Sequence, residues 1–119
     1  MNLLPLVGVL PLVLGSCGQP PGIKISIKND TGAELKNVRL MLSGQKVSIA
    51  NIPNGETGVV SVRPNKESGL DLSFIDKAGL ERVEAVGVYL EPSFCGSVTV
   101  VIAPDGSLTR TANIRAGML

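Results

Sequence analysis

The sequence predicts an all-β fold, an antiparallel β-sandwich of seven or eight strands. Three observations predict it. Apolar side chains alternate with polar ones at a period of two along most of the chain. Turn residues interrupt this alternation about every 8–13 positions, which is typical of sandwiches. No segment has a convincing helical period, and 78–85 is only a weak helical candidate. A small barrel is the alternative architecture.

The first half of the domain contains four expected strands. Residues 23–28 alternate isoleucine with lysine or serine, so they predict a strand with one buried face. Residues 38–42 repeat the pattern, and the Ser43-Gly44 turn leads into 47–49. A loop over 51–57 then precedes 60–62.

The second half contains four more. Residues 70–74 and 98–102 alternate strictly, and 83–90 forms a longer strand that we expect to bend or bulge at Gly87. The turn at 103–106 predicts that 108–111 pairs back onto 98–102. We expect three inward positions to mark the core: Leu40, Leu72 and Val100.

An uncharged run over 3–14 precedes this domain. It is too short to span a bilayer, which requires about 20 apolar residues, but it fits the apolar region of a secretory signal. The predicted organisation is a signal peptide (1–16), a lipidated cysteine with a short tether (17–22), the sandwich (23–112) and a C-terminal tail (113–119).

The run ends in Leu14-Gly15-Ser16-Cys17. This segment resembles the lipobox of bacterial lipoproteins, in which leucine and two small residues precede the cysteine that becomes the new N-terminus. The resemblance implies cleavage between Ser16 and Cys17 and lipidation of Cys17. Two or three acyl chains, at about 0.8 kcal/mol per buried CH₂, would hold the protein firmly to the envelope membrane. Gly18, where aspartate would favour inner-membrane retention, implies the periplasmic side of the outer membrane if the cell has two membranes.

Residues 29–62 carry a second resemblance, to the first half of immunoglobulin-like or fibronectin-III-like domains of bacterial envelope proteins. The matching pattern is Asn-x-Thr-Gly, then Leu-x-Asn-Val, then a Pro-Gly-Glu turn before a valine-rich strand. The matching residues are Asn29, Thr31, Gly32, Leu35, Asn37, Val38, Pro53, Gly55, Glu56 and Val60, and Asn54 interrupts the turn. This pattern implies a fold and not an activity.

The charges are balanced and dispersed, with 11 basic and 10 acidic residues. No basic patch is visible in the sequence, which argues against nucleic acid as a partner. No polybasic segment is visible either, so the lipid alone would hold the protein to its membrane.

The chain has two cysteines. If lipid occupies Cys17, then Cys95 is left alone and no intrachain disulfide forms. We then expect a buried, inert Cys95 thiol, with an intermolecular disulfide as the alternative.

The composition is poor in catalytic groups and metal ligands. The chain has no histidine, which excludes the usual Ser-His and Cys-His pairings. Too few cysteines remain for a zinc site, and the carboxylates are too sparse for a calcium loop. We therefore expect no enzyme activity, no metal and no cofactor.

One segment offers an alternative. Asp30-Thr31-Gly32-Ala33 spells the active-site signature of aspartic proteases, and a retropepsin-like homodimer would pair two such aspartates. That family places two apolar residues before the aspartate, whereas Lys28 and Asn29 precede it here. Asn-Asp-Thr-Gly is also an ordinary turn sequence, which we favour.

A loop over 91–96 gathers Phe94 and Cys95, with Tyr89 just before it. These aromatics could form an exposed contact patch or, as we favour, plug one end of the sandwich. The sequence thus predicts a lipid-anchored envelope protein with a structural or interaction role and an unidentified envelope partner. An inhibitor or immunity-type protein is the alternative from another class.

Overall fold

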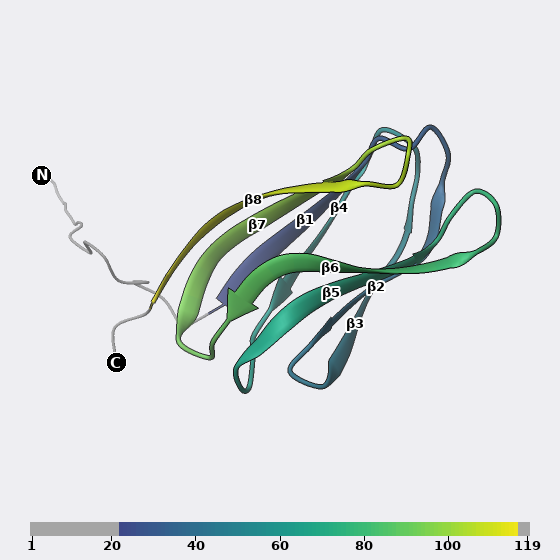
Figure 1. Cartoon of the computed structure of the whole chain (residues 1–119). Helices are drawn as coiled ribbons and strands as arrows, with labels where there is room; N and C mark the ends of the chain where they lie inside the picture. The colour runs from purple at the N-terminus through teal and green to yellow at the C-terminus, as the bar shows by residue number, and fades with distance from the viewer. Residues whose placement is uncertain (1–21, 117–119) are drawn as a thin grey trace, which may run out of the picture.

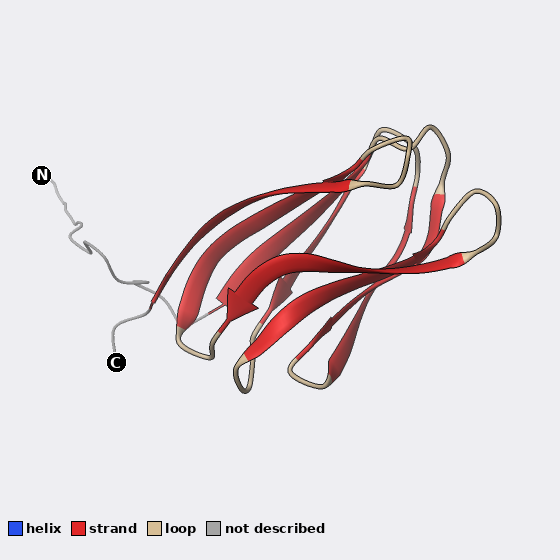
Figure 2. Cartoon of the chain, in the orientation of Figure 1, coloured by secondary structure: helices blue, strands red, loops and turns tan. Residues whose placement is uncertain are grey.

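The computed structural model describes residues 22–116, and this part of the chain is built from β-strands and the loops between them (Figures 1 and 2). The eight strands are β1 (Gly22–Asn29), β2 (Leu35–Leu42), β3 (Gln45–Ile52), β4 (Thr57–Val62), β5 (Ser68–Ile75), β6 (Glu81–Leu90), β7 (Phe94–Ile102) and β8 (Leu108–Ala116). Each expected strand is present, usually with one to three more residues at an end. The weak helical candidate at 78–85 is a turn followed by the start of β6.

The strands form two separate four-stranded sheets and not a closed barrel. Sheet A has the order β4-β1-β7-β8, and sheet B has the order β3-β2-β5-β6. Their inner faces share one apolar core, so the two-layer, all-β prediction is confirmed. Figure 1 shows the two sheets as separate layers whose strands run roughly along the long direction of the domain.

One feature of the predicted topology is wrong. β1 pairs with β7 in parallel, from Gly22 opposite Cys95 to Asn29 opposite Ile102, so sheet A is mixed and not antiparallel throughout. Alternation of apolar and polar residues determines which face of a strand is buried, but not the direction of the neighbouring strand. Because five strands separate β1 from β7 along the chain, no hairpin imposes an antiparallel pair on them.

The predicted C-terminal tail is also wrong in part. β8 continues to Ala116, and residues 113–116 pair with residues 94–97 of β7. The sequence prediction ended at 112 because apolar alternation fades there. β8 is an edge strand whose residues are mostly exposed, so its pairing depends on backbone hydrogen bonds more than on apolar burial.

The core confirms the predicted register. Leu40 and Leu72 of sheet B and Val100 of sheet A are fully buried. β1 contributes Ile23, Ile25 and Ile27, which also have no exposed surface. Val98 and Val100 of β7 lie beside Ile25 and Ile27 in the parallel pair, so β1 and β7 form the centre of sheet A.

The expected bend in β6 occurs at Gly87, which has a φ of 85°. Opposite it, the β5–β6 register shifts between Gly69 and Asp71. The alternation of buried residues keeps one phase along β6: Arg82 and Glu84 are half-buried, and Val86 and Leu90 on the same face are buried. One face of this long edge strand thus carries charged groups in its first half and apolar groups in its second half.

Candidate functional site

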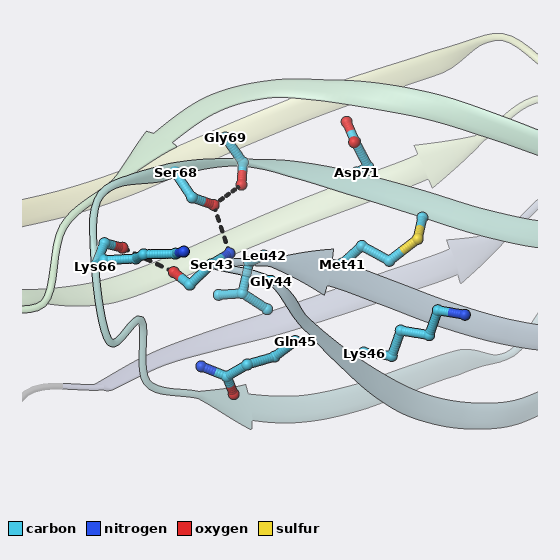
Figure 3. A pocket seen from close by; sticks show the side chains of 10 residues that line it. All are labelled: Met41, Leu42, Ser43, Gly44, Gln45, Lys46, Lys66, Ser68, Gly69 and Asp71. Carbon is cyan, nitrogen blue, oxygen red and sulfur yellow. Dashed lines mark hydrogen bonds between the residues drawn. The ribbon is translucent and has the colours of Figure 1, made fainter.

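A groove lies on the outer side of sheet B, where the β2–β3 hairpin meets the start of β5 (Figure 3). It encloses about 410 Å³ and is open to solvent. Its lining residues are Met41, Leu42, Ser43, Gly44, Gln45, Lys46, Lys66, Ser68, Gly69 and Asp71.

The hairpin turn forms one end of this groove. Ser43 and Gly44 both have positive φ, 52° and 75°, as a two-residue type I′ hairpin turn requires. Positive φ is unusual for serine, and two hydrogen bonds hold it there. The Ser43 amide donates to Ser68 Oγ at 2.7 Å, and Ser43 Oγ donates to the Lys66 carbonyl at 2.7 Å. These bonds join the hairpin to the β4–β5 loop and fix the shape of the groove end.

The other end of the groove carries charge of both signs. Met41 is in register with Lys46 of β3 and with Asp71 of β5, so an ammonium and a carboxylate flank a thioether (Figure 3). Lys66 adds a second ammonium near the hairpin. Such a surface suits a polar peptide or another protein surface. The hydroxyls of Ser43 and Ser68 are occupied in the hydrogen bonds that shape the turn.

The opposite end of the domain is organised by Asn29, which is fully buried. Its Nδ2 donates to the Ala33 carbonyl at 2.7 Å and to the Ile52 carbonyl at 2.9 Å. Its Oδ1 accepts from the amide and hydroxyl of Thr31 at 2.9 and 2.7 Å. One amide side chain thus connects the β1–β2 loop to β3. We call this end of the sandwich the Asn29 end, and the end that holds Gly22 of β1 the Gly22 end.

We call the hydrogen bonds made by the Asn29 side chain the Asn29 hub. Asp30 follows Asn29 in the chain but takes no part in this hub. Its side chain is 45% exposed, and its carboxylate lies 3.6 Å from Lys28 Nζ in a surface ion pair. The Asp-Thr-Gly segment therefore forms an Asx turn around Asn29, in which Gly32 has a φ of 93°.

A smaller cavity of about 200 Å³ lies near the Asn29 end, between the β5–β6 and β7–β8 turns. Arg82 lines it, stacks 5.9 Å from the centre of the Phe74 ring and donates to Glu84 Oε2 at 2.8 Å. A side chain added at Gly106 would collide with Arg82. Asp105, in the same turn, accepts from the amide and hydroxyl of Ser107, and these bonds lower its carboxyl pKa.

Cys95 is disulfide-bonded. The expectation of a lone, inert thiol is therefore wrong. It assumed that lipid occupies the sulfur of Cys17, the only other cysteine in the chain. Cys17 and Ser16, the predicted lipidation and cleavage residues, lie outside the described residues. One sulfur cannot hold both a thioether and a disulfide, so lipidation of Cys17 and a Cys17–Cys95 bond exclude each other.

The aromatic residues near Cys95 divide between the two predicted roles. Phe94 is half-buried and packs against the core, as the plug interpretation predicts. Tyr89 is 52% exposed on β6. Partial desolvation and a hydrogen bond with Glu67 raise its phenol pKa.

Two structural findings bear on possible functions. Among residues 22–116 there is no group of three or more potential metal-ligating side chains. The same residues include no helix with the length and apolarity needed to cross a membrane.

No family model and no curated protein matches the chain. A protein from Eubacterium rectale, whose structure was determined by NMR, has a similar fold. Its TM-score is 0.53 at 12% sequence identity, and the match covers 76% of this chain and 87% of that one. At this identity the likeness concerns the fold alone.

The groove and the Asn29 hub were missed by the sequence analysis. The Ser43-Gly44 turn was visible, but its contact with the β4–β5 loop joins residues 23 to 25 positions apart. Asn29 was seen only as a turn residue, although an asparagine ending an otherwise apolar alternation was the available signal.

Proposed function

We propose that this chain is an exported, lipid-anchored protein of the bacterial cell envelope, with a structural or protein-interaction role. The observation that carries the proposal is the lipobox-like Leu14-Gly15-Ser16-Cys17, which follows an uncharged apolar run. Only five positions separate Cys17 from Gly22, the first residue of β1. Such a tether spans about 17 Å at most, which suits a domain held against a membrane.

The architecture supports the interaction role. Two four-stranded sheets around one core fit an immunoglobulin-like domain, although the parallel β1–β7 pair departs from a fully antiparallel arrangement. The polar groove at the hairpin offers amines, a carboxylate and backbone groups to a partner. The Asp-Thr-Gly segment serves a turn, which favours binding over hydrolysis.

The disulfide at Cys95 supports export, because disulfides persist mainly in oxidising compartments. It also competes with acylation if it lies within the chain, since it would then occupy the sulfur of Cys17. Acylation of Cys17 and a disulfide between Cys17 and Cys95 are alternative fates of one sulfur, and the proposed anchor requires acylation.

Metabolic labelling with a fatty-acid probe tests the anchor. Wild type and Cys95→Ser should incorporate the probe and sediment with membranes, whereas Cys17→Ser should do neither. Peptide mass mapping of the mature protein without a reductant tests for the alternative, a disulfide in place of the lipid. A mature protein joined from Cys17 to Cys95 and free of lipid would overturn the anchor and leave an exported protein.

Cross-linking in intact cells, followed by purification from detergent-solubilised envelope, tests the role. The Met41→Glu variant should lose the cross-linked partner, and the matched control Val59→Glu on the other sheet should retain it. That result would support binding at the groove. Inhibition of a captured enzyme would instead identify an inhibitor, and capture unaffected by Met41→Glu would remove the groove from the proposal.

A further inference from the structure

The two sheets differ in the balance of their charges. The strands of sheet A contain four basic residues and no acidic one, whereas those of sheet B contain four basic and three acidic residues. The basic residues of sheet A are Lys24, Lys28, Arg110 and Arg115. Folding therefore gathers charges that are dispersed in the sequence.

Three basic residues lie on the outer face of sheet A at its Gly22 end. Lys24 is exposed between the fully buried Ile23 and Ile25, so it faces outward. Arg115 is exposed next to Ile114, which packs against the core, so Arg115 faces outward as well.

Arg63, just beyond β4, completes the group. A side chain added at Gly22 would lie 4.0 Å from Arg63 Cγ, which places the arginine stem along the outer side of Gly22. We call Lys24, Arg63 and Arg115 the basic edge. Three strand spacings separate its ends, or about 15 Å.

The residues around the basic edge have short polar side chains. Lys24 pairs with Ser61 on one side and Ser97 on the other, and Ser97 pairs with Asn113. The pairings within sheet A have no register shift, so these short side chains form a regular surface.

Most of the acidic residues lie away from the basic edge. Asp30, Glu56 and Asp105 lie in loops at the Asn29 end, and the three ion pairs found among residues 22–116 involve no member of the basic edge. Two carboxylates do occur in loops at the Gly22 end. Glu67 hydrogen-bonds to Tyr89 of sheet B, and Glu91 also lies near that tyrosine.

We propose that the basic edge docks on the headgroups of anionic phospholipids, so that sheet A faces the membrane. The inference rests on the proposed anchor for its setting, because Cys17 is only five positions from Gly22. A tether of at most about 17 Å keeps these cations close to a charged surface whose field decays over about 8 Å at physiological salt. Each lysine or arginine near such a surface strengthens binding about fivefold.

Co-sedimentation with lipid vesicles tests the basic edge apart from the lipid anchor. The protein used in this experiment begins at Gly18 and carries Cys95→Ser, so it has neither a lipid nor a cysteine. The buried apolar core lies wholly between Ile23 and Ile102 and is retained, and cooperative thermal unfolding verifies each variant. Vesicles are phosphatidylcholine alone or a 7:3 mixture with phosphatidylglycerol.

We expect binding to the anionic vesicles that weakens with added salt, and little binding to phosphatidylcholine. Lys24→Gln/Arg63→Gln/Arg115→Gln should lower the partition coefficient at least tenfold. The matched control Lys36→Gln/Arg39→Gln/Lys77→Gln removes equal charge from sheet B and the β5–β6 turn and should change it less than twofold. Equal losses in the two variants, or equal binding to both vesicles, would overturn the inference. Failure of fatty-acid labelling alone would overturn the anchor and not this surface.

Discussion

Sheets A and B share one core but differ in regularity. The strand pairs of sheet A keep an unbroken register, whereas every strand pair of sheet B contains a shift. Sheet B also holds two residues other than glycine in the left-handed region within its strands, Asn37 with a φ of 54° and Ala50 with a φ of 77°. The regular sheet has a basic outer face, and the irregular one carries the groove and mixed charges.

This difference fits the two roles proposed for the faces. A continuous register keeps side chains in rows, which suits contact with an extended surface such as a membrane. Bulges redirect strands and create local relief, which suits contact with a particular partner. Matched substitutions in the two sheets show whether they also differ in stability.

Core truncation should affect both sheets alike, because one core joins them. Leu72→Ala in sheet B and Val100→Ala in sheet A should each lower the free energy of unfolding by about 2–4 kcal/mol, through lost burial and an added cavity. Denaturant unfolding measures both. A loss below about 1 kcal/mol for either residue would contradict its place in the shared core.

Glycine substitution should instead separate the sheets. Gly96 in β7 has a φ of 129°, and an added side chain would collide with the backbone oxygen of Asn113 in β8. Gly87 in β6 meets only the flexible Arg110 side chain, at 3.4 Å. Gly96→Ala should therefore cost about 3 kcal/mol and Gly87→Ala about 1 kcal/mol in the free energy of unfolding. Comparable losses, measured by the same denaturant titration, would contradict a rigid sheet A and a yielding sheet B.

The Asn29 hub should matter more than the exposed asparagine beside it. Asn29→Ala leaves the Ile52 carbonyl and the Thr31 amide without their side-chain partner, which should cost about 2 kcal/mol. Asn54 accepts from the Gly32 amide at an exposed site, so the control Asn54→Ala should cost less than about 0.5 kcal/mol. Thermal unfolding of both variants measures the difference, and equal effects would contradict the hub.

The sequence was sufficient for most strands because they present a buried face. Ile23, Ile25 and Ile27 alone determine the inward side of β1. It was insufficient for the β1–β7 pair, since backbone pairing between distant strands leaves no mark on side-chain alternation. β8 shows the same limit, because an exposed edge strand needs few apolar residues.

The basic edge was harder to foresee than the strands. Lys24, Arg63 and Arg115 are separated by 39 and 52 positions, and only the strand order brings them to one edge. The expected role of Cys95 failed for a related reason, since it was derived from an assumed fate of Cys17. By contrast, the Asp-Thr-Gly turn was predicted correctly, because an Asx turn depends on residues within four positions of Asn29.

Acid should weaken the turn that holds Asp105. Hydrogen bonds from Ser107 lower the Asp105 carboxyl pKa, so this stabilisation is present above the ordinary pKa of about 4 and is lost as the pH falls through the folded-state value. Asp105→Asn should remove that part of the acid sensitivity. The thermal midpoint at pH 7 and pH 3 checks it for both proteins. The effect should be small because the carboxylate is exposed, and an unchanged acid response would contradict the assignment.

The smallest effect concerns Asp30, at the loop that leaves sheet A for sheet B. Its carboxylate makes only an exposed ion pair with Lys28, and such pairs contribute about 0–1 kcal/mol. Asparagine preserves the shape of the side chain, so Asp30→Asn should change the free energy of unfolding by less than about 0.5 kcal/mol. A carboxylate dyad, by contrast, cannot work with an amide in place of its ionised member. We expect no peptidase activity at acid pH from either form, assayed on an unfolded protein substrate with product peptides measured. Cleavage by the wild type that the substitution abolishes would assign Asp30 to catalysis, and the Asx turn would then be its scaffold.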